Sequence, residues 1–157
     1  MTRPGFIPVH RRSSAASQVF ACLLSAVSFC AHGEVTVKDA WIRATVPAQT
    51  STGAFMTLTS TEDAKVVAAK SPAAKTAEIH ESMVMGGVNH MHEVEALELP
   101  AGKPVALKPG GHHVMLTGLA RALKAGERVP IAFVIEGRDG RRTTLEVSAE
   151  VRPIGSR

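Results

Sequence analysis

Short segments of alternating apolar and polar residues, separated by turn residues, dominate this chain from Glu34 onward. Residues 34–44 (EVTVKDAWIRA) alternate in this way, and residues 141–151 do so again near the end. Alternation is typical of strands with one buried face, because successive side chains point to opposite faces of a sheet. Many short strands with turns between them predict an all-β sandwich or barrel of roughly seven to nine strands.

The expected elements fill residues 34–152 as one domain without an internal repeat. We expect Trp41, Phe55, Ile131 and Phe133 in its core and a brief helical turn at 121–125. Residues 153–157 are expected to form a short flexible tail. The predicted strands are residues 34–44, 53–59, 65–71, 77–85, 88–96, 105–108, 112–116, 129–136 and 141–151.

Residues 1–33 have the composition of a secretory signal peptide. Three arginines and no acid precede an apolar run at residues 19–31, and Ala31-His32-Gly33 then offers small residues at the expected cleavage positions. The alternative is an N-terminal membrane anchor, but a run of 13 residues is short for a spanning helix. We therefore predict cleavage near Gly33 and export to the periplasm.

Cleavage would change the charge and the cysteine content of the protein. Its net charge would fall from +4 to +1, because Arg3, Arg11 and Arg12 are the charged residues removed. A nearly neutral chain gives no reason to expect nucleic-acid binding or stable membrane association. Cys22 and Cys30 would also leave, so the mature protein would have neither a disulfide nor a thiolate.

Residues 80–115 gather the side chains that bind soft and borderline metals. Outside residues 1–33, all five histidines and four of the five methionines lie in this window. Imidazoles and thioethers together suit Cu(I) above other ions. The window therefore predicts a copper site on a strand-rich fold. Its potential ligands are His80, Met83, Met85, His90, Met91, His92, His112, His113 and Met115.

Gly86-Gly87 predicts a two-residue hairpin loop, which fixes the pairing of the strands on either side. Ser82 then lies opposite Met91, and His80 lies opposite Glu93. Opposed residues and residues two apart share a face, so His80 and Met91 form a diagonal pair about 7–8 Å apart. A one-residue shift would reverse this sorting. The opposite face would carry three further potential ligands: Met83, His90 and His92.

The other predicted ligands follow the turn at Pro109-Gly110-Gly111. On the next strand His113 and Met115 share one face, while His112 takes the other. Methionine ligands disfavour zinc and hard cations and favour Cu(I). Thioethers also escape the oxidation to disulfide that threatens a cysteine pair outside the cytosol. The simplest site contains two imidazoles and two thioethers, from His80, Met91, His113 and Met115.

Each of these residues also has a simpler interpretation when it is taken alone. Met56 is expected to be a core residue, and Met91 or Met115 by itself would be one too. Met83 and Met85 flank the hairpin turn and are candidates for accessory copper contacts or for contacts with a partner. Three histidines fit an exposed polar face equally well: His90, His92 and His112.

The spacing of the four predicted ligands resembles the signature of the periplasmic PCu(A)C copper chaperones. In that signature a His, ten residues, a Met and twenty-one residues precede His-x-Met, and the spacing from His80 through Met91 to His113 and Met115 is the same. The resemblance covers residues 34–152. Similar flanking residues are Ala40-Trp41-Ile42-Arg43-Ala44, Glu78-Ile79-His80-Glu81 and Leu107-Lys108-Pro109-Gly110-Gly111.

This resemblance implies a cupredoxin-like Greek-key β-sandwich with a Cu(I) site near its surface. It also implies a periplasmic copper carrier, with a copper-accepting subunit of cytochrome c oxidase and a Sco-type thioredoxin-like metallochaperone as partners. We expect a monomer. Some relatives bind Cu(II) through a His/Met-rich tail, but residues 153–157 contain neither residue type. A weaker accessory Cu(II) site would therefore need His90, His92 or His112.

Competing functions fit the residues less well. A blue-copper electron carrier needs a Cys thiolate, and a structural zinc module would not use Met at two of four positions. Ser82 and His80 are close in sequence, but no motif supplies the remainder of a hydrolase site. We therefore expect a carrier and not an enzyme. A periplasmic copper buffer or resistance protein would use the same ligands and remains the alternative.

Overall fold

The computed structural model describes residues 33–156, and all the regular structure in that range is strand. The predicted all-β fold is confirmed, with one strand more than expected. The additional strand spans three residues at Leu97–Leu99, too few for alternation to be recognised in the sequence. The strands are β1 Val35–Arg43, β2 Ser51–Ser60, β3 Ala64–Lys70, β4 Thr76–Met85, β5 Val88–Glu93, β6 Leu97–Leu99, β7 Pro104–Leu107, β8 His112–Thr117, β9 Arg128–Gly137 and β10 Arg142–Arg152.

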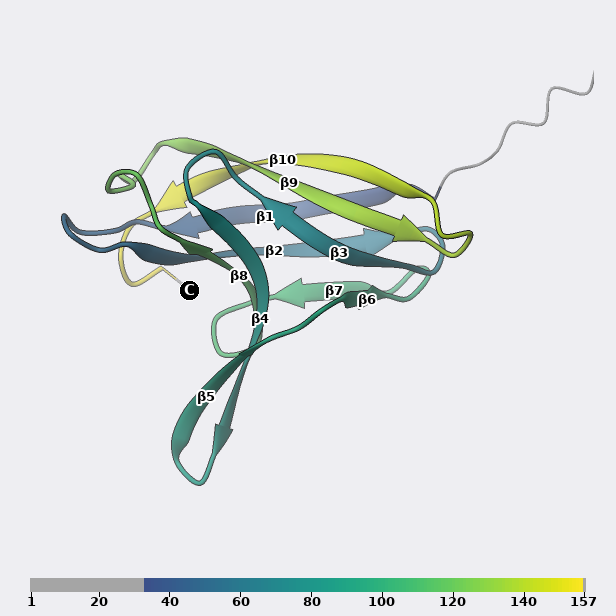
Figure 1. Cartoon of the computed structure of the whole chain (residues 1–157), viewed down its shortest axis with the longest axis horizontal. Coiled ribbons are helices and arrows are strands. Elements are labelled where there is room, and N and C mark those ends of the chain that lie inside the picture. Colours follow the sequence, from purple (N-terminus) through teal and green to yellow (C-terminus); the bar gives the residue numbers. More distant parts are fainter. Residues whose placement is uncertain (1–32, 157) are drawn as a thin grey trace, which may run out of the picture. The chain divides into compact units, whose positions relative to one another are not determined.

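The ten strands form one sheet that closes on itself around the core (Figure 1). Its order is β5-β4-β8-β2-β1-β10-β9-β3-β6, and β7 pairs with β2 beside this path. A pairing of Ala69 on β3 with Ala77 on β4 closes the sheet. β1 and β10 run parallel, and β1 runs antiparallel to β2. Strands far apart in sequence thus become neighbours, as Greek-key connections require, and the predicted fold class is confirmed.

The buried side chains confirm the expected core and divide it into two parts. Ile131 and Phe133 are fully buried in the main cluster, and Met56 also belongs to it. Trp41 and Phe55 are nearly as buried but lie outside this cluster. Their ring centroids are 4.5 Å apart. The chain therefore has a separate aromatic pair, which lies next to the candidate site described below.

A bulge in β1 sets the position of the aromatic pair. The register between β1 and β2 shifts between Lys38 and Trp41, where Asp39 adopts a φ of 53°. Asp tolerates this left-handed conformation better than most residues. After the shift Trp41 pairs with Phe55 across the two strands. A bulge re-aims the side chains that follow it, and here it brings both rings to the same face.

The hairpin of β4 and β5 has the predicted turn and register. Gly86 and Gly87 have φ values of 60° and 80°, as a tight turn with two left-handed residues requires. Ser82 pairs with Met91 and His80 with Glu93. The hairpin extends away from the remainder of the sandwich (Figure 1), and every residue of β5 is exposed.

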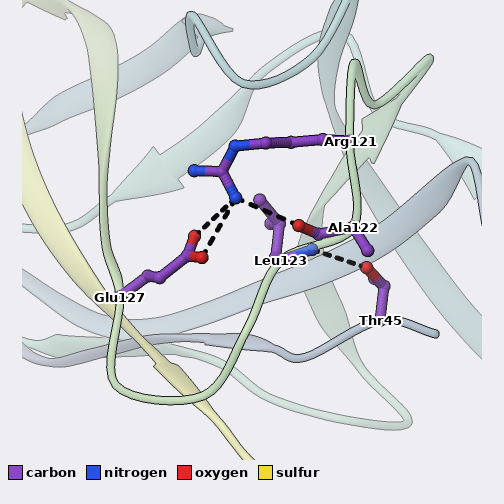
Figure 2. Close-up of polar contacts among 5 residues, drawn as sticks. All are labelled: Thr45, Arg121, Ala122, Leu123 and Glu127. Carbon is purple, nitrogen blue, oxygen red and sulfur yellow. Dashed lines mark hydrogen bonds and ion pairs between the residues drawn. The ribbon is translucent and has the colours of Figure 1, made fainter. Parts of the chain in front are cut away.

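The predicted helical turn at 121–125 is wrong, because other partners take up its backbone hydrogen bonds. The N–H of Leu123 donates to Thr45 Oγ1 at 2.8 Å, and the Thr45 N–H donates to the Leu123 carbonyl at 3.0 Å. Arg121 Nη1 donates to both carboxylate oxygens of Glu127 and to the carbonyl of Ala122 (Figure 2). The segment is therefore an ordered loop, held by hydrogen bonds to Thr45 just beyond the end of β1.

Replacing Thr45 by Val should destabilise the protein by about 1–3 kcal/mol. The change leaves the buried Leu123 N–H without its acceptor, and an unsatisfied buried donor carries roughly that cost. Urea unfolding of the purified variant measures the loss. The matched control is Thr36→Val, which removes an exposed hydroxyl contact of 3.3 Å and should change stability by less than about 0.5 kcal/mol. Equal losses in the two variants would contradict the role assigned to Thr45.

The predicted signal peptide, residues 1–33, lies outside the described residues except for Gly33. Within residues 33–156 no helix is long and apolar enough to cross a membrane. β10, the last strand, ends at Arg152.

Candidate metal centre

Three neighbouring strands bring the four predicted ligands onto one face of the sheet. His80 on β4 pairs directly with His113 on β8, and Met115 lies two residues beyond His113. Met91 on β5 pairs with Ser82, two residues from His80. Because paired residues and alternate residues share a face, all four side chains lie on the same side of β5-β4-β8.

This face is the outer one. Ile79 and Val114 pair with each other on the opposite face, and both are buried in the main core. The potential ligands therefore do not belong to that core. Met91 is 46% exposed, and Met115 is half-buried. One exposed and one half-buried thioether therefore lie beside two imidazoles, outside the main core.

An open pocket of about 200 Å³ lies between three of the four residues. Met91, His113 and Met115 line it, together with Arg43 and Phe55. His80 is outside this lining, but its ring centroid is 6.0 Å from that of His113. A larger hollow of about 510 Å³ along β1 and β10 has no His or Met in its lining. Of these two pockets, the smaller one therefore has the soft donors that suit Cu(I).

The ring of His113 is held in the form that can bind a metal. Its Nδ1 lies 3.0 Å from the carbonyl oxygen of Gly111, which can only accept a hydrogen bond, so Nδ1 carries the proton. In the neutral ring Nε2 then keeps a free lone pair. Burial lowers the pKa of His113 below its ordinary value, and the nearby charges of His80, His112 and Arg43 lower it further, whereas the bond to Gly111 opposes them. The imidazole is therefore kept neutral.

His80 has the converse arrangement. Its Nε2 lies 3.2 Å from a carboxylate oxygen of Glu78, which accepts a hydrogen bond from the N–H of that nitrogen. The other nitrogen, Nδ1, is buried and has no hydrogen-bond partner among the described residues. An unpaired buried nitrogen is costly, and such atoms are rare in folded proteins. A bound metal ion would satisfy it.

Glycine at position 53 allows the aromatic pair to approach the site. Gly53 pairs with Met115 across β2 and β8. A Cβ atom at this position would lie 2.7 Å from the Phe55 ring, a distance that real side chains do not tolerate. The Phe55 ring can thus extend beside residue 53, and its centroid is 6.2 Å from that of His113. This packing helps to bury His113, which is 5% exposed.

Met83, His90 and His92 lie on the other face of the hairpin, as predicted, and His112 takes the corresponding face of β8. Met83 pairs with His90, and Glu81 pairs with both His92 and His112. Within residues 33–156 no group of three or more His, Cys, Asp or Glu is already gathered for a metal ion. A metal site already assembled in that range would therefore need a ligand of another type, such as Met.

Sequence reasoning missed the two groups that orient the imidazoles. Glu78 precedes His80 by two residues in a predicted strand, so alternation alone could have placed it on the same face. The Gly111 carbonyl gave no such signal, because its contact with His113 depends on how the turn before β8 folds.

Replacing Glu78 by Gln should weaken Cu(I) binding by about tenfold. Loss of a carboxylate that supports a ligating His typically costs roughly 10- to 100-fold in metal affinity, and the partial exposure of Glu78 favours the lower end. A Cu(I) titration against a competing chelator measures the change. Glu93→Gln is the control, because Glu93 lies opposite His80 but forms no ion pair with it. Equal affinities in the two variants would contradict this role for Glu78.

Comparison with known proteins identifies the family. The sequence model of the LpqE-like family, described as putative lipoprotein LpqE-like, matches residues 35–151. The chain belongs to this family. Putative lipoprotein Lxx21020 from Leifsonia xyli subsp. xyli is 35% identical over 100 residues, which span 63% of this chain and 60% of that protein. The match thus covers less than two thirds of the relative.

Solved structures agree with this assignment. The solution structure of CuI-DR1885 from Deinococcus radiodurans is 38% identical with a TM-score of 0.58, over 78% of this chain and 81% of that one. The copper-bound PCuAC domain from PmoF2 has a TM-score of 0.59 over 78% of this chain and 98% of that domain, and at 19% identity it shares the fold. The resemblance to the PCu(A)C copper chaperone family is confirmed.

Proposed function

We propose that this protein is a copper chaperone that binds one Cu(I) ion through His80, Met91, His113 and Met115. His80 would use Nδ1 and His113 would use Nε2. Copper is the cargo of such a protein and not a catalytic centre, so we propose a carrier and not an enzyme. The copper-bound state of DR1885, a relative at 38% identity, supports the choice of metal.

The observation that carries this proposal is the convergence of two imidazoles and two thioethers on one face of three strands. His80 and His113 are cross-strand neighbours, and each has one nitrogen free for a metal. The other nitrogen of each ring is held by Glu78 or by the Gly111 carbonyl. Support of this kind is typical of metal-binding histidines.

The donor set favours Cu(I) over Cu(II). Thioethers are soft donors, whereas Cu(II) prefers harder donors in a tetragonal plane. All four proposed ligands are neutral, so the bound ion keeps its whole charge. Keeping a double charge in a partly buried pocket costs more than keeping a single one. Arg43 lines the same pocket and adds to this penalty.

We propose that the copper is delivered in the periplasm, toward the dinuclear centre of cytochrome c oxidase, with a Sco-type metallochaperone as a further partner. The predicted signal peptide and the naming of relatives as putative lipoproteins both support export. The predicted signal peptide and the lipoprotein names imply different attachments of the protein to the membrane. A lipoprotein would stay attached to the membrane, whereas cleavage near Gly33 would release a free protein.

Deleting the gene tests delivery against storage. If the protein delivers copper, oxidase assembly should fail at low copper and recover when copper is added, with little change in survival at high copper. Complementation with the wild-type gene should restore assembly, and complementation with a Met91→Leu, Met115→Leu gene should not. Normal oxidase assembly combined with copper sensitivity would instead support a buffer or resistance protein.

A further inference from the structure

A second group of metal-binding side chains lies on the face of the hairpin opposite the proposed Cu(I) site. Glu81 on β4 pairs with His92 on β5 and with His112 on β8. The three residues therefore form a row across three adjacent strands, with the carboxylate in the middle. Since neighbours along a strand point to opposite faces, this row is separated from His80 and His113 by the sheet itself.

Both imidazoles of this row face the same carboxylate. Nε2 of His92 lies 3.5 Å from one oxygen of Glu81, and Nε2 of His112 lies 3.7 Å from the other. These distances exceed those of well-formed hydrogen bonds. All three side chains are at least 31% exposed, so no close packing holds them. Within residues 33–156 no such group is already assembled for a metal ion, so binding at this row requires its exposed side chains to rotate until both nitrogens and the carboxylate reach one ion.

We propose that Glu81, His92 and His112 form a second metal site, which takes a borderline divalent cation and binds Cu(II) most tightly. Two imidazoles and a carboxylate are nitrogen and oxygen donors without sulfur, which suits Cu(II) and Zn(II) and not Cu(I). Among divalent first-row metals such a donor set generally holds Cu(II) best. The exposure of the row leaves room for water to complete the coordination. The proposal does not depend on the Cu(I) site.

Electron paramagnetic resonance of added Cu(II) tests this site. The full protein is first loaded with one equivalent of Cu(I), which gives no signal and occupies the other face, and one equivalent of Cu(II) is then added without oxygen. We expect a tetragonal signal with coupling to two imidazole nitrogens. His92→Gln and His112→Gln should each lose one nitrogen and weaken Cu(II) binding at least about tenfold, because removing a ligand should cost no less than removing a group that supports one.

His90→Gln is the matched control. His90 lies on the same strand and face as His92, but it pairs with Met83 and has no carboxylate partner among residues 33–156. Its replacement should leave the Cu(II) signal and affinity unchanged. All three variants should keep the wild-type affinity for Cu(I). If the protein takes up no Cu(I), the proposed function fails, and the same Cu(II) comparison on metal-free protein still tests this site.

Two results would overturn the proposal. One is Cu(II) binding that is the same in His92→Gln, His112→Gln and the wild type. The other is an equal loss in His90→Gln, which would indicate non-specific binding to exposed histidines. His92 is on an exposed edge strand, so its replacement cannot be confused with a folding defect, and circular dichroism checks the His112 variant.

Discussion

Replacing Met91 and Met115 together by Leu should weaken Cu(I) binding by more than about a hundredfold. Loss of a supporting residue alone can cost roughly 100-fold, and this variant removes two of the four proposed donors. Leu has nearly the volume of Met, so each change should lower stability by less than about 1.5 kcal/mol. A competitive titration with a chromophoric Cu(I) chelator measures the affinity, and urea unfolding measures the stability.

The control for this experiment is the double variant His90→Gln, His92→Gln. It removes two potential ligands from the same hairpin, but from the opposite face. We expect its Cu(I) affinity to match that of the wild type. Unchanged affinity in the double Leu variant would mean that the methionines do not bind copper. Equal weakening in both double variants would mean that Cu(I) affinity does not depend on which face of the hairpin loses its ligands.

Replacing Phe133 by Ala should destabilise the protein by about 3–5 kcal/mol, the usual cost of truncating a buried Phe. Phe133 is the largest fully buried side chain in the described part of the chain. Phe133 on β9 pairs with Ala69 of β3 and with Leu145 of β10, and it belongs to the main core cluster, so the cavity would open in that core. Urea unfolding measures the loss.

Val84→Ala provides the comparison for Phe133. Val84 is 74% exposed near the tip of the hairpin, so its truncation should change stability by less than about 0.5 kcal/mol. A loss in the Phe133 variant no larger than this would contradict the position of the core. The Phe133 variant should also bind Cu(I) with nearly wild-type affinity while it remains folded, because Phe133 does not line the pocket.

Alternation and turn residues were sufficient to predict most strands and the half of the site that lies on the hairpin of β4 and β5. The Gly86-Gly87 loop fixes which residues of β4 and β5 face each other, so His80 and Met91 could be placed on one face from local sequence alone. The helical turn at 121–125 was mispredicted because Thr45, far away in the sequence, takes up the hydrogen bonds of Leu123. Local patterns contain no information about such a partner.

The second half of the site depends on the order of strands in the sheet. Only the pairing of β4 with β8 places His80 next to His113, and these strands are separated in sequence by β5, β6 and β7. Periodicity predicts the faces of each strand but not its neighbours. The same holds for Phe55, which reaches the site from β2 because β2 pairs with β8. The ligand spacing shared with the PCu(A)C family indicated that His113 and Met115 join His80 and Met91, which alternation alone could not predict.

The X-ray absorption spectrum of the Cu(I)-loaded protein tests the proposed site most directly, because it counts the sulfur and nitrogen atoms bound to the metal. We predict two sulfur and two nitrogen neighbours for the wild type, and loss of both sulfur neighbours in the Met91→Leu, Met115→Leu variant. A coordination shell of nitrogen and oxygen alone in the wild type, or sulfur neighbours that persist in the double variant, would contradict copper binding by His80, Met91, His113 and Met115.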